Sequence, residues 1–273
     1  MDVEKLELSE SDKSSGIGFL KQHSVYETYP AHTHDFYEIF LVTKGKAIHV
    51  VNGITQLVTR GSFVFIRPED MHYYDYFKTY DFEFMTLGIP ISEMENIFAY
   101  LNLSFDILLS PIEAPNTLLE GSTLIEIEKK LEGIGKQKIG EERHSFFLAV
   151  MPWLTYKLYQ YMSEDSHKLV VPSWFIQLIG KMGERDNYVL GLVRMLELAN
   201  YSQEHLTRLF RKYLDLTPTE FINEKRMQYA VELLQLKQYD VLEICHMSGC
   251  NNLSHFYHLF KKTYGCSPKE YVK

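Results

Sequence analysis

The stretch Phe210–Phe221 reads FRKYLDLTPTEF, and fifty residues later Phe260–Tyr271 reads FKKTYGCSPKEY. Each copy opens with a phenylalanine and two cations, and its second half carries Thr or Ser, then Pro, then Glu two residues further on. That second half is typical of a helix start, because the hydroxyl caps the first turn, proline fits the first position and glutamate completes a capping box. A repeat at a fixed period indicates that one structural unit is used twice.

Each copy belongs to a predicted pair of helices joined by a tight turn. Apolar residues at helical spacing mark the first pair at Leu192, Met195, Leu196 and Ala199 and then at Leu206, Leu209, Phe210 and Tyr213. The second pair is marked by Val241–His246 and then by Leu253, Phe256, Phe260 and Tyr264. The turns hold Asn200 and Gly249, which tolerate a positive φ, and the following helices have suitable N-caps in Ser202 and in Asn251 or Asn252. This pattern predicts two helix-turn-helix motifs, the plain alternative being a helical bundle with duplicated caps.

The second motif carries a longer signature. The string G-C-x5-F-x3-F-K-x3-G-x2-P-x2-Y over Gly249–Tyr271 resembles the C-terminal signature of the arabinose-regulator (AraC/XylS) family, and the resemblance extends over Ser173–Lys273. Cys250 stands where Phe is usual, Cys245 where Ala is usual, and Asp215 where a glycine closes the first motif; none of these departures removes a basic residue.

A closer resemblance is carried by two short segments. Ser202–Arg208 and Ile222–Arg226 are similar to the branch of the family that regulates chitobiose operons, which implies a role in sugar utilisation.

The family resemblance implies that the second helix of each motif reads DNA bases. The outward residues expected to read bases are Gln203, Glu204, Thr207 and Arg208 in the first motif and Asn252, Leu253, Ser254, His255 and His258 in the second. Arginine pairs with guanine through two hydrogen bonds, and a carboxylate accepts from the cytosine amine. The cations expected on phosphates are Arg211, Lys212, Lys261 and Lys262. A helix over 219–236 would hold the readers about 34 Å apart, one DNA turn; the alternative for any one residue is an ordinary solvated position.

The N-terminal part predicts β-structure. Residues 17–88 alternate apolar and polar positions between turn signals such as Asn52-Gly53, which favours an antiparallel sandwich or barrel. From about Ile91 the period becomes helical, with helices expected over 92–103, 117–132 and 142–162, the last kinked at Pro152.

Two short motifs in this part resemble the cupin motif pair, which lies on adjacent strands of a small barrel. They are His32-x-His34-x3-Glu38 and Gly61-x5-Arg67-Pro68-x3-His72. His32, His34 and Glu38 are expected on one face, and His72 arrives from another strand. Three imidazoles and a carboxylate suit Zn²⁺, Fe²⁺, Ni²⁺ or Mn²⁺. The alternative is a metal-free pocket in which these four residues and Tyr37 bind a small ligand.

Charge and composition limit the function further. The net charge of −8 divides into −10 over residues 1–171 and +2 from Pro172 onward. The N-terminal part is therefore acidic and the C-terminal part mildly basic. No run approaches the 18 apolar residues of a membrane span, and Met1–Ser15 has no signal-peptide core. The three cysteines show no metal-ligand spacing. We therefore expect a cytoplasmic protein with reduced thiols and no membrane association.

These patterns predict an α+β chain of four parts. They are a cupin-like antiparallel β-barrel sensor over 1–90, a helical connector over 91–167, a linker over 168–173 and an all-α domain with both helix-turn-helix motifs over 174–273. The expected function is a transcription regulator without catalytic residues that binds operator DNA and a sugar or phosphosugar effector, with RNA polymerase as a further partner. We also expect a homodimer, for which Phe147, Val150 and Leu154 are candidate contacts unless they cover the barrel.

Two functions other than transcription regulation are alternatives for this sequence. One is a cupin metalloenzyme, of the dioxygenase or sugar isomerase type, whose helical tail serves only for assembly. The other is a passive sugar-binding protein, which does not explain the duplicated motif.

Overall fold

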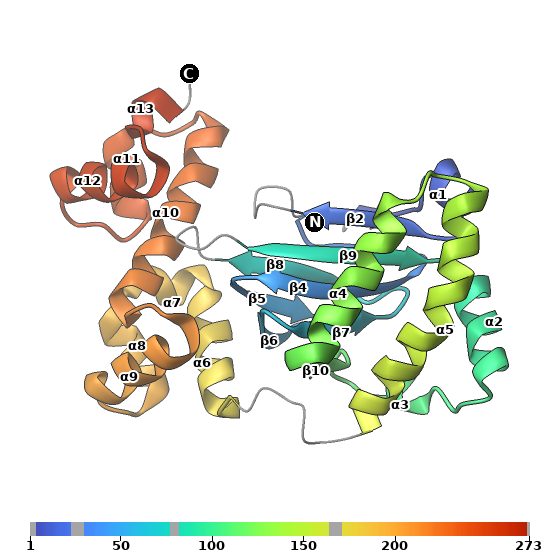
Figure 1. Cartoon of the computed structure of the whole chain (residues 1–273). Helices are drawn as coiled ribbons and strands as arrows, with labels where there is room; N and C mark the ends of the chain where they lie inside the picture. The colour runs from blue at the N-terminus through green and yellow to red at the C-terminus, as the bar shows by residue number, and fades with distance from the viewer. Residues whose placement is uncertain (1–3, 23–29, 77–81, 164–170, 272–273) are drawn as a thin grey trace. The chain divides into compact units, whose positions relative to one another are not determined.

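The computed structural model describes residues 4–22, 30–76, 82–163 and 171–271, which form two compact units. The described residues up to Ser163 make the first unit, and those from Val171 onward make the second (Figure 1). Each unit has its own buried core.

The first unit contains two five-stranded sheets. One sheet has the order β1 (Glu4–Leu6), β3 (His32–His34), β8 (His72–Tyr76), β5 (Lys46–Val51) and β6 (Ile54–Thr59). The other has the order β10 (Asn116–Leu118), β7 (Ser62–Ile66), β4 (Tyr37–Lys44), β9 (Glu83–Ile89) and β2 (Gly18–Gln22). The pairing is antiparallel except between β1 and β3, and Asn52 and Gly53, both at positive φ, turn β5 into β6. The antiparallel barrel-like architecture predicted from the turn signals is confirmed.

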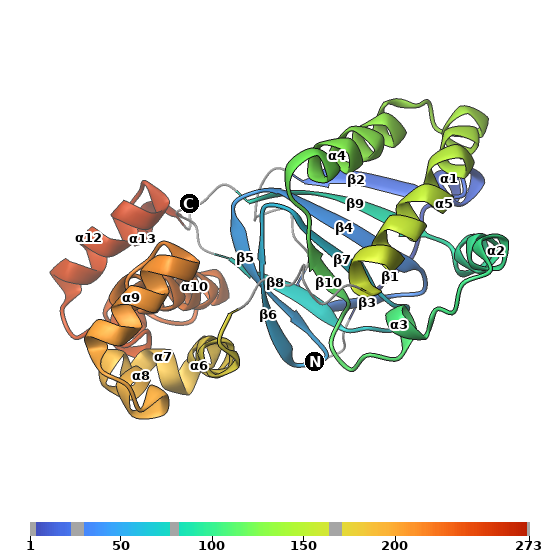
Figure 2. The same ribbon diagram turned by 60° about the horizontal axis from the view of Figure 1, so that its bottom comes forward.

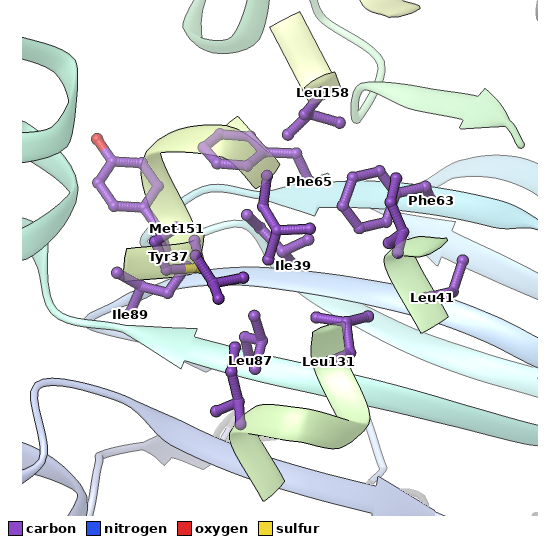
Figure 3. Packing of buried hydrophobic residues seen from close by; sticks show 14 of the residues in the cluster. Tyr37, Ile39, Leu41, Phe63, Phe65, Leu87, Ile89, Leu131, Met151 and Leu158 are labelled. Carbon is purple, nitrogen blue, oxygen red and sulfur yellow. The ribbon is translucent and has the colours of Figure 1, made fainter. Parts of the chain in front are cut away.

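Helices cover one face of the sheet that contains β4. They are α2 (Ile91–Leu101), α3 (Asp106–Leu109), α4 (Gly121–Lys136) and α5 (Glu141–Ser163), whereas the short α1 (Glu10–Ser14) contributes no residue to the core beneath them. Figure 3 shows Ile39 and Leu41 packed on this side with Leu131 of α4 and Met151 of α5. The alternate residues, such as Phe40, belong to a second apolar cluster that also includes residues of the other sheet. Since both faces of β4 are buried, its central segment Ile39–Val42 is a continuous apolar run instead of an alternating one.

One sequence-based expectation about the helical region is wrong, and another is decided between two open roles. Residues 116–118 do not belong to a helix over 117–132, because they pair as β10 with the edge of β7 and bury Thr117; α4 begins only at Gly121. The periodicity of a short segment does not reveal a pairing partner fifty residues away. The candidate dimer contacts Phe147, Val150 and Leu154 are at most 6% exposed and lie in the core between α5 and the sheet, which is the covering role that the sequence left open.

The second unit is helical (Figures 1 and 2). Its elements are α6 (Ser173–Gly183), α7 (Arg185–Leu190), α8 (Leu192–Ala199), α9 (Gln203–Leu214), α10 (Pro218–Leu236), α11 (Val241–Met247), α12 (Leu253–Tyr264) and α13 (Pro268–Tyr271). The pairs α8–α9 and α11–α12 are the two predicted helix-turn-helix motifs, and α10 connects them. Of the expected linker 168–173, residues 168–170 lie outside the described residues, and α6 begins at Ser173.

None of the helices in the described ranges has both the length and the apolar character that a membrane span requires.

Candidate functional site

The second helix of each motif begins in the same way. The side chain of Ser202 accepts a hydrogen bond from the backbone N–H of His205 at 3.2 Å, and Asn252 accepts from that of His255 at 2.9 Å. Just before these caps, Asn200 and Gly249 adopt the positive φ values of 53° and 81° that the tight turns need. The sequence therefore fixes where both helices start.

The two helices also bury the same positions. Leu206 and Phe210 of α9 are fully buried, as are Phe256 and Phe260 of α12 fifty residues later. Twelve of the thirteen residues expected to contact DNA are exposed, namely Gln203, Glu204, Arg208, Arg211, Lys212, Asn252, Leu253, Ser254, His255, His258, Lys261 and Lys262. Thr207 is half-buried, and its hydroxyl donates to the carbonyl of Gln203 at 2.8 Å.

One residue of α9 that the sequence analysis did not single out contacts a predicted base reader. Nη2 of Arg208 lies 2.9 Å from Nδ1 of His205, which is half-buried. The spacing of three residues on a helix places two side chains on one face, so the signal was present in the sequence.

In the first unit, β3, β4 and β8 bring His34, Glu38 and His72 together in the barrel interior. The Nε2 atoms of the two histidines are 3.2 Å apart, and Oε2 of Glu38 lies 3.4 Å from that of His34 and 3.3 Å from that of His72. All three residues are at most 8% exposed. The potential ligand atoms lie within 4.8 Å of one another, so the three residues form a compact set of donors for one ion or one polar ligand atom.

Two of the expected pocket residues are placed differently. His32 is buried and its ring centroid lies 4.3 Å from that of His72, but it is outside the three-residue donor group; its Nδ1 lies 2.8 Å from the carbonyl of Pro30. Tyr37 belongs to the core under the helices, where its ring stacks on Phe65. Because neighbouring residues of a strand point to opposite faces, Tyr37 points away from the interior that Glu38 enters, and its assignment to the same pocket is corrected.

A further histidine joins the cluster from β5. Nε2 of His49 lies 3.1 Å from Nδ1 of His72, and Nδ1 of His49 lies 2.9 Å from the amide nitrogen of Gln56. The sequence analysis missed His49 because it is a single histidine in an apolar strand with no motif around it. The available signal was its spacing on the strand. His49 is two residues from Ala47 and two from Val51, whose side chains point inward, so its own side chain points inward as well.

Burial and charge control the protonation of this cluster. Burial lowers the pKa of His72 to about 4 and lowers that of His49 well below its usual value. Burial also acts to lower the pKa of His34, but the contact with Glu38 outweighs it and leaves that pKa raised. Burial would raise the pKa of Glu38, whereas His34 and His72 hold it well below the usual range. Glu38 is therefore an anion among imidazoles.

The hydrogen-bond pattern partly fits a divalent metal ion. Nδ1 of His34 lies 2.8 Å from the carbonyl of Phe36, so this nitrogen carries the proton and Nε2 offers a lone pair to the cluster, the usual arrangement of a ligating histidine. Oε2 of Glu38 has no well-directed hydrogen bond among the described residues, although its other oxygen accepts from Thr86.

On the side of the cluster formed by β5 and β6, the hydrogen bonds determine which histidine nitrogens carry a proton. The amide of Asn116 donates to Oε1 of Gln56 at 3.3 Å, which turns the Gln56 NH₂ toward Nδ1 of His49. His49 then donates to Nδ1 of His72, and the proton of His72 sits on Nε2, between His34 and Glu38. Ligation of a metal by His72 requires this tautomer to reverse.

An open cleft of about 440 Å³ lies on the surface of the first unit and, among the described residues, reaches the cluster only through Phe36. Its lining includes Phe36, whose ring stacks on His34 at 4.5 Å, together with the polar residues Lys13, Asp35, Ser92 and Glu95. Its volume lies within the range of small-molecule sites.

Comparison with known proteins yields matches to both units. A family model described as "AraC-like ligand binding domain" matches residues 17–125, and one described as "Helix-turn-helix domain" matches residues 195–273. The HTH-type transcriptional activator RhaS of Mannheimia succiniciproducens is 23% identical over 92% of each chain, and RhaS of Pectobacterium atrosepticum is 25% identical over 88% of this chain and 86% of its own. A crystal structure of apo ToxT from Vibrio cholerae covers 94% of this chain and 97% of its own, with 15% identity and a TM-score of 0.42.

Proposed function

The chain belongs to the AraC family of transcription regulators, with a ligand-binding unit and a DNA-binding helix-turn-helix unit, and we propose from this that α9 and α12 read operator DNA under the control of a sugar-like effector. Its relatives are transcription activators, so the metalloenzyme alternative is not favoured, and we propose that this chain also activates transcription.

One observation carries the DNA-reading proposal. α9 and α12 begin with equivalent caps, bury apolar residues at equivalent positions and expose equivalent faces, each of which ends in two cations. A helix that is buried along one side and exposes polar side chains with terminal cations on the other suits insertion into a major groove.

We assign the exposed residues by chemistry. Arg208 and Glu204 of α9 and Asn252 and His258 of α12 offer hydrogen bonds to base edges, with Gln203, Thr207, Ser254 and His255 as neighbours and Leu253 as an apolar contact for a thymine methyl. Arg211, Lys212, Lys261 and Lys262 are assigned to phosphates, which position the protein without reading sequence.

The effector site is proposed at the cleft lined by Phe36. An aromatic ring suits the apolar face of a sugar, and the carboxylates of Asp35 and Glu95 suit its hydroxyls. Lys13 adds a cation that would favour a phosphosugar. Because Phe36 stacks on His34, a ligand that contacts Phe36 in this cleft would affect the histidine cluster through that ring.

A divalent ion is the second candidate occupant of the sensor, supported by the convergence of His34, Glu38 and His72. Such an ion, whether Zn²⁺, Ni²⁺, Fe²⁺ or Mn²⁺, would supply a positive charge to bind an effector oxygen, with His32 as a nearby fourth donor. Native mass spectrometry of the purified protein, before and after incubation with a chelator, measures bound metal, bound ligand and subunit number together.

We further propose a homodimer that acts in the cytoplasm and contacts RNA polymerase when bound to DNA. In place of the buried residues first considered, the exposed apolar residues Ile125 of α4 and Leu148 and Tyr156 of α5 are suggested as the contact with a second copy. The domain limits 1–90, 91–167, 168–173 and 174–273 are retained as a proposal.

The decisive experiment is selection of duplexes from a randomised library by the full-length protein, followed by titrations of the selected duplex at several salt concentrations. We expect one enriched sequence and an affinity that falls steeply with salt, because phosphate contacts release counterions. Absence of any enriched sequence would contradict the proposal.

A further inference from the structure

We infer that His205 is a positioning residue that holds the guanidinium of Arg208 for reading a base, and thereby sets sequence preference at one position of the operator. This inference rests on the proposed role of Arg208 in base reading. It adds a residue that touches no base and acts through the arginine three positions further along α9.

The hydrogen bond between the two side chains has a defined direction. Arginine only donates, so Nδ1 of His205 is the acceptor for Nη2 of Arg208 at 2.9 Å. The tautomer that makes this hydrogen bond carries its proton on Nε2. A guanidinium has five N–H donors, and one is used here, so a pair remains for the two acceptors of a guanine.

The imidazole is itself held in place by a stack of rings. His205 lies 4.9 Å from Tyr201 with an angle of 19° between the ring planes, and Tyr201 lies 4.3 Å from Trp174 of α6 at 26°. The backbone of His205 is fixed as well, because its N–H is capped by Ser202. The acceptor atom thus has a fixed position at the start of the reading helix, and the stack connects it to the first helix of this unit.

A held arginine binds a base with less loss of side-chain freedom than a free one. Arg208 is exposed, so without a partner it would sample many rotamers. Ordering one such side chain on binding lowers affinity by between about two- and tenfold. Because His205 already restricts the Arg208 side chain in the free protein, part of this loss of affinity is avoided. The gain applies only to the base that Arg208 contacts.

The second motif supplies a matched control. His255 occupies the position of His205 fifty residues later, but His258 stands where the first motif has Arg208 and Asn251 stands where it has Tyr201. The His255 side chain therefore has no arginine three residues further along the helix to hold.

The test is library selection with full-length variants at one salt concentration. Arg208→Ala identifies the operator position that Arg208 reads. His205→Phe keeps a ring for the stack but removes the acceptor, and His205→Asn restores an acceptor oxygen. We expect His205→Phe to weaken preference at the Arg208 position by between about two- and tenfold, and His205→Asn to recover part of it. His255→Phe, at a residue proposed to lie beside the base readers of α12, should change preference only at positions that α12 reads and leave the Arg208 position unchanged.

The outcomes separate this inference from the proposed function. If Arg208→Ala abolishes the preference at a position and His205→Phe leaves it intact, the positioning role is overturned while DNA reading stands. A uniform loss at all positions in His205→Phe, with unchanged circular dichroism, also overturns the role. If the unaltered protein selects no sequence, both this inference and the proposed function fail.

Discussion

Among single residues, the buried histidines of the sensor are titratable groups whose pKa values differ from those in water. His49 and His72 have pKa values well below that of a free histidine because burial disfavours the imidazolium, whereas His34 is raised by Glu38. In the unfolded chain all three histidines titrate near pH 6.5. The folded and unfolded states therefore bind different numbers of protons between pH 6.5 and about 4.

We expect the free energy of unfolding of the sensor to fall as the pH drops from 6.5 to about 4. His72 stays neutral in the fold but is protonated when unfolded, so acid favours unfolding, by about 3 kcal/mol for a shift from 6.5 to about 4. His49 acts in the same direction and His34 in the opposite one. Urea titrations across this range measure the effect. His72→Gln should flatten the curve, and an unchanged slope in that variant would contradict the assignment.

The proposed roles of Arg208 as a base reader and Lys261 as a phosphate contact predict different effects of substituting the two residues. Arg208→Ala removes a base contact and should relax preference at one position, with a cost of about 1–3 kcal/mol on the preferred duplex. Lys261→Ala removes a phosphate contact, so it should weaken binding to all duplexes and lower the salt slope by about 1. Fluorescence anisotropy with the selected and a scrambled duplex distinguishes the two. Equal weakening of both duplexes by both changes would refute this division of roles.

Among the elements of the second unit, the turn before α12 packs closely against α7 and α10. A Cβ on Gly249 would lie 2.5 Å from the carbonyl oxygen of Val189 at the end of α7 and 3.0 Å from Nε of Arg226 on α10. Arg226 in turn donates to the carbonyls of Tyr188 and Val189, at 3.2 and 2.7 Å. The end of α7, the middle of α10 and the second turn therefore meet at one point, and glycine is required there for space as well as for its φ of 81°.

Gly249→Ala is therefore expected to be far more destabilising than Gly265→Ala. Both glycines have positive φ, which costs an L-residue about 1–2 kcal/mol, but the Cβ at Gly265 meets nothing within 4 Å. The backbone clash at Gly249 should bring its cost to about 3 kcal/mol or more. Thermal unfolding of both variants measures the difference. Asp215, which adopts φ 56° at the equivalent position of the first motif, already shows that the position of Gly265 accepts a side chain. Equal destabilisation by the two changes would mean that space at Gly249 is not limiting.

The protein as a whole consists of two units, and each unit is stabilised by its own core. The core of the first unit joins the sheet of β4 to α2, α4 and α5, and a core of the second joins α10, α11 and α12. Cooperative unfolding requires shared packing, so units with separate cores are expected to unfold in separate transitions.

We therefore expect two transitions in scanning calorimetry of the full chain. A sugar or metal ion that binds the first unit should stabilise only one transition, by about 2.7 kcal/mol at a concentration one hundred times its dissociation constant. The fragment 171–273 should reproduce the other transition and select the same DNA sequence. A single transition that shifts as a whole with ligand would show that the units unfold together.

Elements with local signals were predictable from the amino-acid sequence alone. Caps, turn residues and helical spacing sufficed for both helix-turn-helix motifs, because Ser202, Asn252 and Thr217 bond to backbone groups only three residues away. The hairpin at Asn52-Gly53 was predictable for the same reason. The two motif strings also identified three of the histidines and the glutamate of the sensor.

Features that depend on residues distant in the chain became clear only from the folded protein. It made residues 116–118 a strand by pairing them with β7, placed Tyr37 under the helices, and used Phe147 for the core instead of a dimer contact. It also brought His49 to His72 and Trp174 to Tyr201. Such contacts arise when sheets and helices bury their apolar faces against one another, and no local spacing in the chain records which faces will meet.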